Sequence, residues 1–179
     1  MSTMNVLICQ QPKELVWKQR EIPIPGDNEA LIKIKSVGIC GTDIHAWGGN
    51  QPFFSYPRVL GHEICGEIVG LGKNIADLKN GQQVAVIPYV ACQQCPACKS
   101  GRTNCCEKIS VIGVHQDGGF SEYLSVPVAN ILPADGIDPQ AAALIEPFAI
   151  SAHAVRRAAI APGEQVLVVA DQDKYDLGY

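Results

Sequence analysis

The stretch EALIKIKSVGIC, residues 29–40, alternates apolar and polar side chains. Ile32 and Ile34 fall on one face of an extended chain, while Lys33 and Lys35 fall on the other. A period of two with one apolar and one charged face is typical of a strand that covers a core with one side. The stretch therefore predicts a β-sheet with one solvent-exposed face.

Similar short runs extend this pattern along the chain. Residues 5–10 and 15–25 read as a strand pair around a turn at Pro12 and Lys13, and 63–72 and 81–90 read as two more strands. Residues 118–133 predict a further strand with a short partner. Many short strands separated by turn signals favour a barrel or a sandwich, so the expected fold class is mainly β.

The pattern changes after Pro133. Asp138, followed by Pro139, predicts a helix start, and a second helix is expected from about 147 to 160. The run PGEQVLVVA, residues 162–170, then predicts a strand that is buried on both faces, as in a parallel sheet.

Composition excludes several classes of protein. The net charge is −4 and no basic stripe is present, so a nucleic-acid partner is not expected. No signal-peptide pattern and no apolar run of about 18 residues are found, so we expect a soluble, cytoplasmic chain with no membrane partner. In that compartment eight cysteines are expected to be buried, metal-bound or catalytic rather than disulfide-bonded.

Five of the eight cysteines lie in ACQQCPACKSGRTNCCEK, residues 91–108. Cys92, Cys95 and Cys98 lie three positions apart, and the adjacent Cys105 and Cys106 follow. Four converging thiolates suit a closed structural zinc site, and an iron–sulfur cluster is the alternative. Spacing alone leaves Cys105 and Cys106 as competing fourth ligands. Cys9 and Cys65 lie in strand-like contexts and are expected in the core.

A second group of metal-binding residue types is spread along the sequence. Cys40 ends one predicted strand, and His62 and Glu63 begin another, while Glu146 is an acid within an apolar stretch. A cysteine and a histidine at strand ends suit an open zinc site. Taken singly, each has a simpler interpretation, as a core residue, a helix cap or a surface acid.

The joint pattern resembles a known family. GICGTDIH (38–45), GHEICGEIVGLG (61–72), the four-cysteine loop, GVHQDGGFSEY (113–123) and IEPFAISAHAV (145–155) occur in one order. This order is similar to that of the zinc-dependent medium-chain alcohol and polyol dehydrogenases, in particular their sugar-alcohol and sugar-acid branch. The resemblance implies a GroES-like β-barrel catalytic domain with a zinc lobe, over residues 1–145. Residues 146–179 would then be an interdomain helix and the start of a Rossmann domain.

The resemblance also assigns roles to residues. It implies a catalytic zinc on Cys40 and His62, with Glu63 or Glu146 completing the shell. It implies a structural zinc on four cysteines, the seven-residue gap selecting the last of them: Cys92, Cys95, Cys98 and Cys106. Thr42 would accept the alcohol proton, His45 would relay it outward, and Asp43 would orient the ligand histidine.

The activity implied is oxidation of a secondary alcohol, with hydride transfer to NAD or NADP. The expected substrate is a small sugar acid or polyol, specifically L-galactonate, and the full-length protein is expected to form a homo-oligomer. From loop position, Arg58, His115 and Gln116 are candidate substrate contacts.

The sequence departs from the family after the VLVV run, where no glycine-rich nucleotide-binding turn follows. We therefore expect a catalytic portion that is inactive alone. A non-enzymatic zinc module and a zinc hydrolase are the alternatives.

Overall fold

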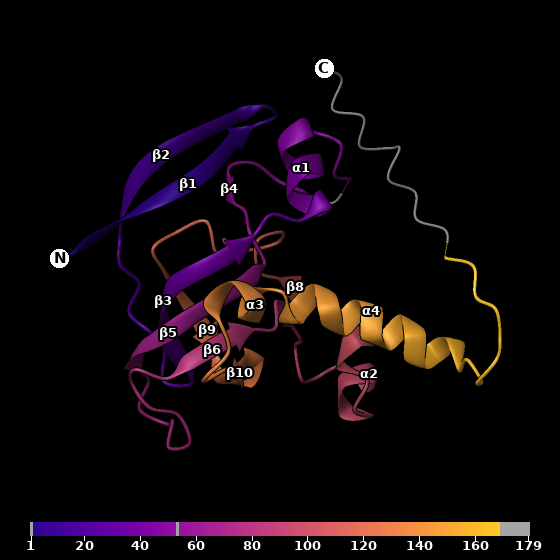
Figure 1. The fold of residues 1–179 in the computed structure, drawn as a ribbon. Helices are drawn as coiled ribbons and strands as arrows, with labels where there is room; N and C mark the ends of the chain where they lie inside the picture. The colour runs from indigo at the N-terminus through magenta and orange to yellow at the C-terminus, as the bar shows by residue number, and fades with distance from the viewer. Residues whose placement is uncertain (1, 53, 169–179) are drawn as a thin grey trace.

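The structure, a computed structural model, describes residues 2–52 and 54–168 (Figure 1). Its strands are β1 (Thr3–Gln11), β2 (Glu14–Glu21), β3 (Glu29–Gly38), β4 (Arg58–Val59), β5 (Glu63–Leu71), β6 (Gln83–Val86), β7 (Tyr89–Val90), β8 (Ser110–Val111), β9 (Tyr123–Pro127) and β10 (Ile131–Pro133). Its α-helices are α1 (Gly41–Gly48), α2 (Pro96–Lys99), α3 (Pro139–Ala143) and α4 (Ile145–Ala158), and its 3-10 helices are η1 (Thr103–Cys105) and η2 (Val128–Asn130). The mainly β fold class is confirmed.

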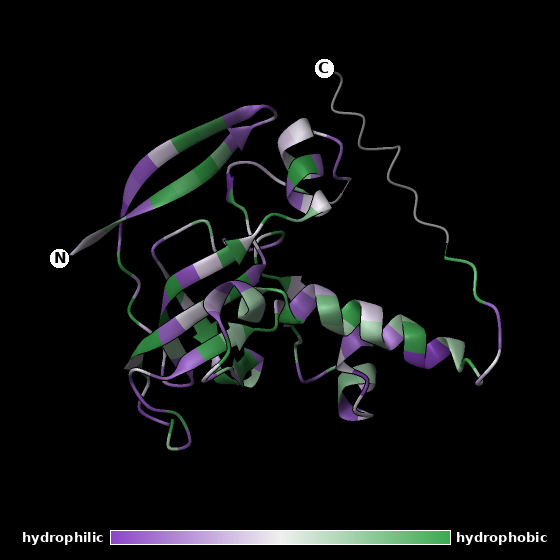
Figure 2. Cartoon of the chain, in the orientation of Figure 1, coloured by the Kyte–Doolittle hydropathy of each residue, from purple (hydrophilic) through white to green (hydrophobic). Residues whose placement is uncertain are grey.

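The largest sheet holds the core. Its five strands run in the order β10-β6-β5-β3-β9, and all neighbours are antiparallel. In the centre, Ile32 of β3 faces Ile68 of β5 and Leu124 of β9. Figure 2 shows hydrophilic and hydrophobic residues alternating along β3, as the period of two predicts. The buried apolar cluster of this sheet comprises Ala30, Ile32, Ile64, Ile68, Val84, Val86, Ile112, Val126 and Ile131.

The N-terminal hairpin forms a second sheet. β1 and β2 are antiparallel and turn at Pro12 and Lys13, as predicted, and β4 pairs with the other edge of β1. Lys13 takes the left-handed conformation (φ 65°), and its N–H donates to the carbonyl of Trp47 in α1 (2.6 Å). The tip of the hairpin is thereby fixed against α1, the helix that follows Cys40.

Residues 118–122 join the two sheets. The Leu7 N–H donates to the Phe120 carbonyl (2.8 Å), and the Ile34 N–H donates to the Glu122 carbonyl (2.9 Å). Phe120 in turn donates to the carbonyl of Leu60 (2.9 Å). Gly61 follows with φ 89°, and a Cβ there would lie 2.7 Å from the Phe120 ring. Only glycine fits this close approach, which sets the position of the next residue, His62.

The two predicted C-terminal helices are confirmed. The Asp138 side chain caps α3 by accepting from the N–H groups of Gln140 (3.0 Å) and Ala141 (3.2 Å), and Pro139 takes the first helical position. The next helix, α4, projects away from the sheets in Figure 1 and buries none of its residues among the described parts of the chain. No helix within residues 2–52 and 54–168 is long and apolar enough to cross a bilayer.

Two strand predictions are wrong in detail. β9 and β10 do not pair with each other, since η2 separates them and carries the chain to the opposite edge of the five-stranded sheet. The expected strand over 162–170 is also not formed as far as Val168, and Leu167 is 86% exposed. A parallel strand needs a neighbour to satisfy its backbone, and none of the described strands pairs with this run. Its remainder, and 171–179, lie outside the described residues.

Candidate metal centres

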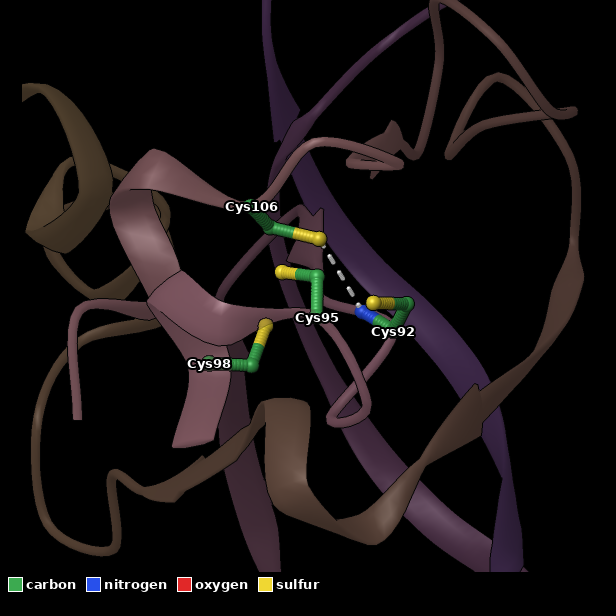
Figure 3. A group of neighbouring side chains, drawn as sticks. All are labelled: Cys92, Cys95, Cys98 and Cys106. Carbon is green, nitrogen blue, oxygen red and sulfur yellow. Dashed lines mark hydrogen bonds between the residues drawn. The ribbon is translucent and has the colours of Figure 1, made fainter. Parts of the chain in front are cut away.

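The cysteine-rich loop folds around a tetrathiolate group (Figure 3). Cys92, Cys95, Cys98 and Cys106 each offer a sulfur, and all four sulfurs lie within 4.8 Å of one another. Cys95 precedes α2, whose first residue is Pro96, so the short helix turns Cys98 back toward Cys95. η1 then returns the chain so that Cys106 is 7% exposed, whereas Cys105 points to solvent. The structure thus brings Cys106, and not Cys105, into the group.

Backbone N–H groups surround these sulfurs. The N–H of Cys92 donates to the Cys106 sulfur (3.3 Å), and that of Lys108 donates to the same atom (3.4 Å). Hydrogen bonds from the backbone of Gln94 and Cys95 lower the pKa of Cys92 to about 6. Such donors stabilise thiolates, the form that binds metal. The group therefore has the donor set and the closed shape of a structural zinc site.

A second group forms where β3 ends and β5 begins. Cys40, His62 and Glu63 offer ligand atoms within 4.8 Å of one another. His62 and Glu63 are buried, and Cys40 is half-buried. The three residues come together because Gly38 pairs with Glu63 in the β3–β5 ladder, which puts Cys40 beside His62. Sulfur, imidazole and carboxylate together are a donor set that suits zinc.

Asp43 organises this second group. Its Oδ2 accepts from the Cys40 N–H (2.9 Å), and its Oδ1 accepts from the Gly61 N–H (2.9 Å). Oδ1 also lies 3.8 Å from Nδ1 of His62. α1 begins directly after Cys40, its N-cap, and Asp43 at the third helical position reaches back to the Cys40 N–H. Because Asp43 accepts from Cys40 and from Gly61, it links the end of β3 to the start of β5.

The charges at this group favour metal binding. Hydrogen bonds from His62 and Thr42, opposed by burial, lower the pKa of Cys40. Burial alone would lower the pKa of His62, yet the hydrogen bond with Cys40 and the charges of Asp43, Cys40 and Glu146 raise it. Nδ1 of His62 is buried without a hydrogen-bond partner among the described residues. Nδ1 faces Asp43, so the other ring nitrogen of His62 is left for a divalent cation beside the Cys40 thiol.

The remaining predicted site residues lie around this group. Thr42 hydrogen-bonds the Cys40 thiol, and His45 follows three residues later on α1, so their side chains share one face of the helix. Glu146, in the first turn of α4, is close enough for its charge to act on His62, but it is not among the three mutually adjacent ligands.

Tyr89 was not predicted as a site residue. Its hydroxyl donates to Oε1 of Glu146 (2.6 Å) across 57 positions of sequence. Nothing in the run IPYV marks the tyrosine as functional, because only the fold brings β7 beside the start of α4.

The three candidate substrate contacts are engaged elsewhere. Arg58 lies 3.6 Å from the carboxylate of Asp117, which also binds Arg20. His115 accepts from the Val111 N–H (3.0 Å), and Gln116 donates to the Ser110 hydroxyl (3.1 Å). A role of these three residues in substrate binding stays a prediction.

Comparison with known proteins agrees with this geometry. The family model "Alcohol dehydrogenase GroES-like domain" matches residues 26–136. The chain is 41% identical over 167 residues to the starvation-sensing protein RspB of Escherichia coli (strain K12), covering 92% of this chain and 49% of that protein. It is 34% identical over 171 residues to an L-threonine 3-dehydrogenase of Chelativorans sp., again 92% of this chain and 49% of the relative. The chain thus spans about half the length of the curated relatives it matches.

Solved structures give the same result. A crystal structure of an alcohol dehydrogenase, rspB, from E. coli CFT073 in complex with NADH aligns with a TM-score of 0.81 and 40% identity, over 88% of this chain and 46% of that one. Galactitol-1-phosphate dehydrogenase from Escherichia coli aligns with a TM-score of 0.82 and 33% identity, over 87% and 45%. Family model, relatives and structures show that the chain belongs to the zinc-type medium-chain alcohol dehydrogenase family, of which it carries the GroES-like domain.

Proposed function

We propose that the chain is the catalytic part of a zinc-dependent, NAD(P)-linked dehydrogenase that oxidises a secondary alcohol. The observation that supports this most is the convergence of ligand atoms from Cys40, His62 and Glu63 within 4.8 Å of one another. Residues 1–145 would form the catalytic domain, and 146–179 would lead into the nucleotide-binding domain.

Each protein group has a defined task in this proposal. Cys40 and His62, through Nε2, would hold the catalytic zinc, and Glu63 would supply the acidic ligand. Asp43 faces Nδ1 of His62 and keeps that ring in place. When bound, the zinc supplies a Lewis acid that lowers the pKa of a substrate hydroxyl. The four cysteines of the loop hold a second, structural zinc: Cys92, Cys95, Cys98 and Cys106.

Thr42 and His45 form the proton path. The Thr42 hydroxyl, which contacts the Cys40 thiol, is placed to accept the proton of the substrate hydroxyl. His45, one helical turn further along α1, passes that proton outward. NAD or NADP, held by a nucleotide-binding domain, would supply the hydride acceptor.

The proposed substrate is a sugar acid or polyol, with L-galactonate as the specific candidate, and the full-length enzyme is proposed to be a homo-oligomer. The names of two relatives, a threonine 3-dehydrogenase and a galactitol-1-phosphate dehydrogenase, support a small, polar, hydroxylated substrate. L-galactonate is put forward from the overall resemblance of the sequence to the sugar-acid branch of the family.

Metal analysis tests the site directly. The chain should bind two zinc ions, and His62→Ala should bind one. A matched His153→Ala control, on the exposed face of α4, should keep two. A wild-type chain with one zinc would contradict the proposal.

Turnover tests the reaction. The full-length protein should reduce NAD or NADP with L-galactonate or another polyol in a panel that includes L-threonine and galactitol 1-phosphate. Hydrolysis of model esters without nucleotide, in place of nucleotide reduction, would instead favour a zinc hydrolase.

A further inference from the structure

We propose that Tyr89 is a positioning residue that holds the Glu146 carboxylate beside the Cys40–His62–Glu63 group, as an additional acidic partner for the metal. The inference rests on the proposed function, since it concerns the same site. It assigns a role to a residue in a segment that otherwise only leads into the zinc lobe.

The first support is the contact itself. The Tyr89 hydroxyl donates to Oε1 of Glu146 (2.6 Å), a short hydrogen bond between a phenol and a carboxylate. This bond uses one of the two carboxylate oxygens, so Tyr89 fixes Glu146 through Oε1.

The second support is the location of this pair. Burial, the hydrogen bond to Glu146 and the charges of Glu146 and Cys40 all raise the pKa of Tyr89. The charge of Glu146 also acts on His62. Glu146 is thus close enough to act on His62 without belonging to the three residues that already converge.

The third support is the anchoring of Tyr89. Its backbone is held at two points, because it pairs with Val111 in the β7–β8 ladder and its carbonyl accepts from the Asn130 side chain (3.1 Å). Glu146, in contrast, sits on α4, which buries no residue among the described parts of the chain. A side chain on such a helix needs an outside contact to keep its place, and the Tyr89 hydroxyl provides one.

The test compares metal binding by the wild type and Tyr89→Phe, which removes one oxygen atom and keeps the ring. We expect binding at the Cys40 site to weaken about tenfold, as for other residues that orient metal ligands. Cobalt replacing zinc gives a second readout, because its visible spectrum should change at the Cys40 site and stay unchanged for the tetrathiolate group. Tyr123→Phe, which removes a hydroxyl from β9, should leave both readouts unchanged.

A double variant tests whether Tyr89 acts through Glu146. Tyr89→Phe should have no additional effect in a Glu146→Gln background, since the two residues then form one unit. Wild-type affinity and spectrum in Tyr89→Phe, with two metals still bound, would overturn this inference alone. An additive loss in the double variant would do the same. A wild type that binds metal only at the four cysteines would overturn the proposed function and this inference together.

Discussion

Oδ1 of Asp43 lies 3.8 Å from Nδ1 of His62, and the two side chains are 3% and 8% exposed. The same oxygen accepts the Gly61 N–H, and the other carboxylate oxygen accepts the Cys40 N–H. The buried Asp43 carboxylate therefore contacts the backbone of Cys40, the backbone of Gly61 and the imidazole of His62. An acid that faces one ring nitrogen leaves the other nitrogen to bind a metal.

Asp43→Asn should weaken metal binding at the Cys40 site. The amide has a single acceptor oxygen for the two N–H groups of Cys40 and Gly61, and it carries no charge to face His62. We expect about a 10-fold to 100-fold loss of zinc affinity at this site. The unsatisfied N–H should also reduce the free energy of unfolding by about 1–3 kcal/mol. Competition with a chelator and urea denaturation measure the two effects, and the tetrathiolate group is the internal reference.

The identity of the fourth cysteine ligand gives a second prediction. Cys106 faces the other three sulfurs, while Cys105 is exposed. Cys106→Ser should therefore bind one zinc fewer than the wild type, and Cys105→Ser should bind the same number. Mass spectrometry under native conditions counts the ions. The opposite result would show that the loop closes through Cys105.

Removal of zinc should make the Cys92 thiol much more reactive than that of Cys98. Backbone hydrogen bonds lower its pKa to about 6, whereas burial raises the pKa of Cys98 to about 12. At pH 7 Cys92 is then mostly thiolate and Cys98 is mostly thiol, and the thiolate is the nucleophile. Alkylation of Cys92 should slow as the pH falls through about 6, while that of Cys98 should rise only in strong alkali.

Peptide mapping after brief treatment with iodoacetamide and a chelator measures this order. A Cys105→Ser background removes the exposed thiol, and zinc-loaded protein, with all four sulfurs protected, is the control. Equal labelling of Cys92 and Cys98 at pH 7 would contradict the prediction.

Local patterns in the sequence were sufficient for most of the fold. Alternation over 29–40 predicted β3, and Asp138 with Pro139 predicted the start of α3, because both signals depend on neighbouring residues alone. The pairing of β9 and β10 could not be read in this way. Which strands meet is decided by the whole sheet, and η2 takes β10 to β6 at the far edge.

The candidate sites divide in the same way. The spacing of the cysteines was sufficient to predict a four-cysteine metal site. The seven-residue gap of the family identified Cys106, rather than Cys105, as the fourth ligand. Cys40, His62 and Glu63 were candidates from their positions at predicted strand ends, and the family resemblance joined them into one site, because 22 positions separate Cys40 from His62 in sequence. The contact between Tyr89 and Glu146 had no sequence signal, since it joins two elements that no local pattern relates.

Gly38→Ala should disturb the metal group without touching a ligand. A Cβ at Gly38 would lie 2.0 Å from Oε2 of Glu63 and 3.0 Å from its Cβ, so the carboxylate must move away. Glu63 is buried, and we expect its displacement to cost about 1–3 kcal/mol of stability. Loss of this acidic ligand should weaken zinc binding at the Cys40 site by about tenfold or more.

Gly48→Ala is the matched control, because a Cβ there meets only the Asn50 side chain at 3.5 Å, an ordinary contact. Zinc competition and thermal unfolding of the two variants separate the effects on binding and on stability. If Gly38→Ala lost stability but bound zinc as tightly as Gly48→Ala, Glu63 would not be a ligand, and Glu146 would be left as the acid of the site. Tyr89→Phe should then weaken zinc binding more strongly than the tenfold expected when both acids contribute, because the tyrosine would hold the only carboxylate available to the metal.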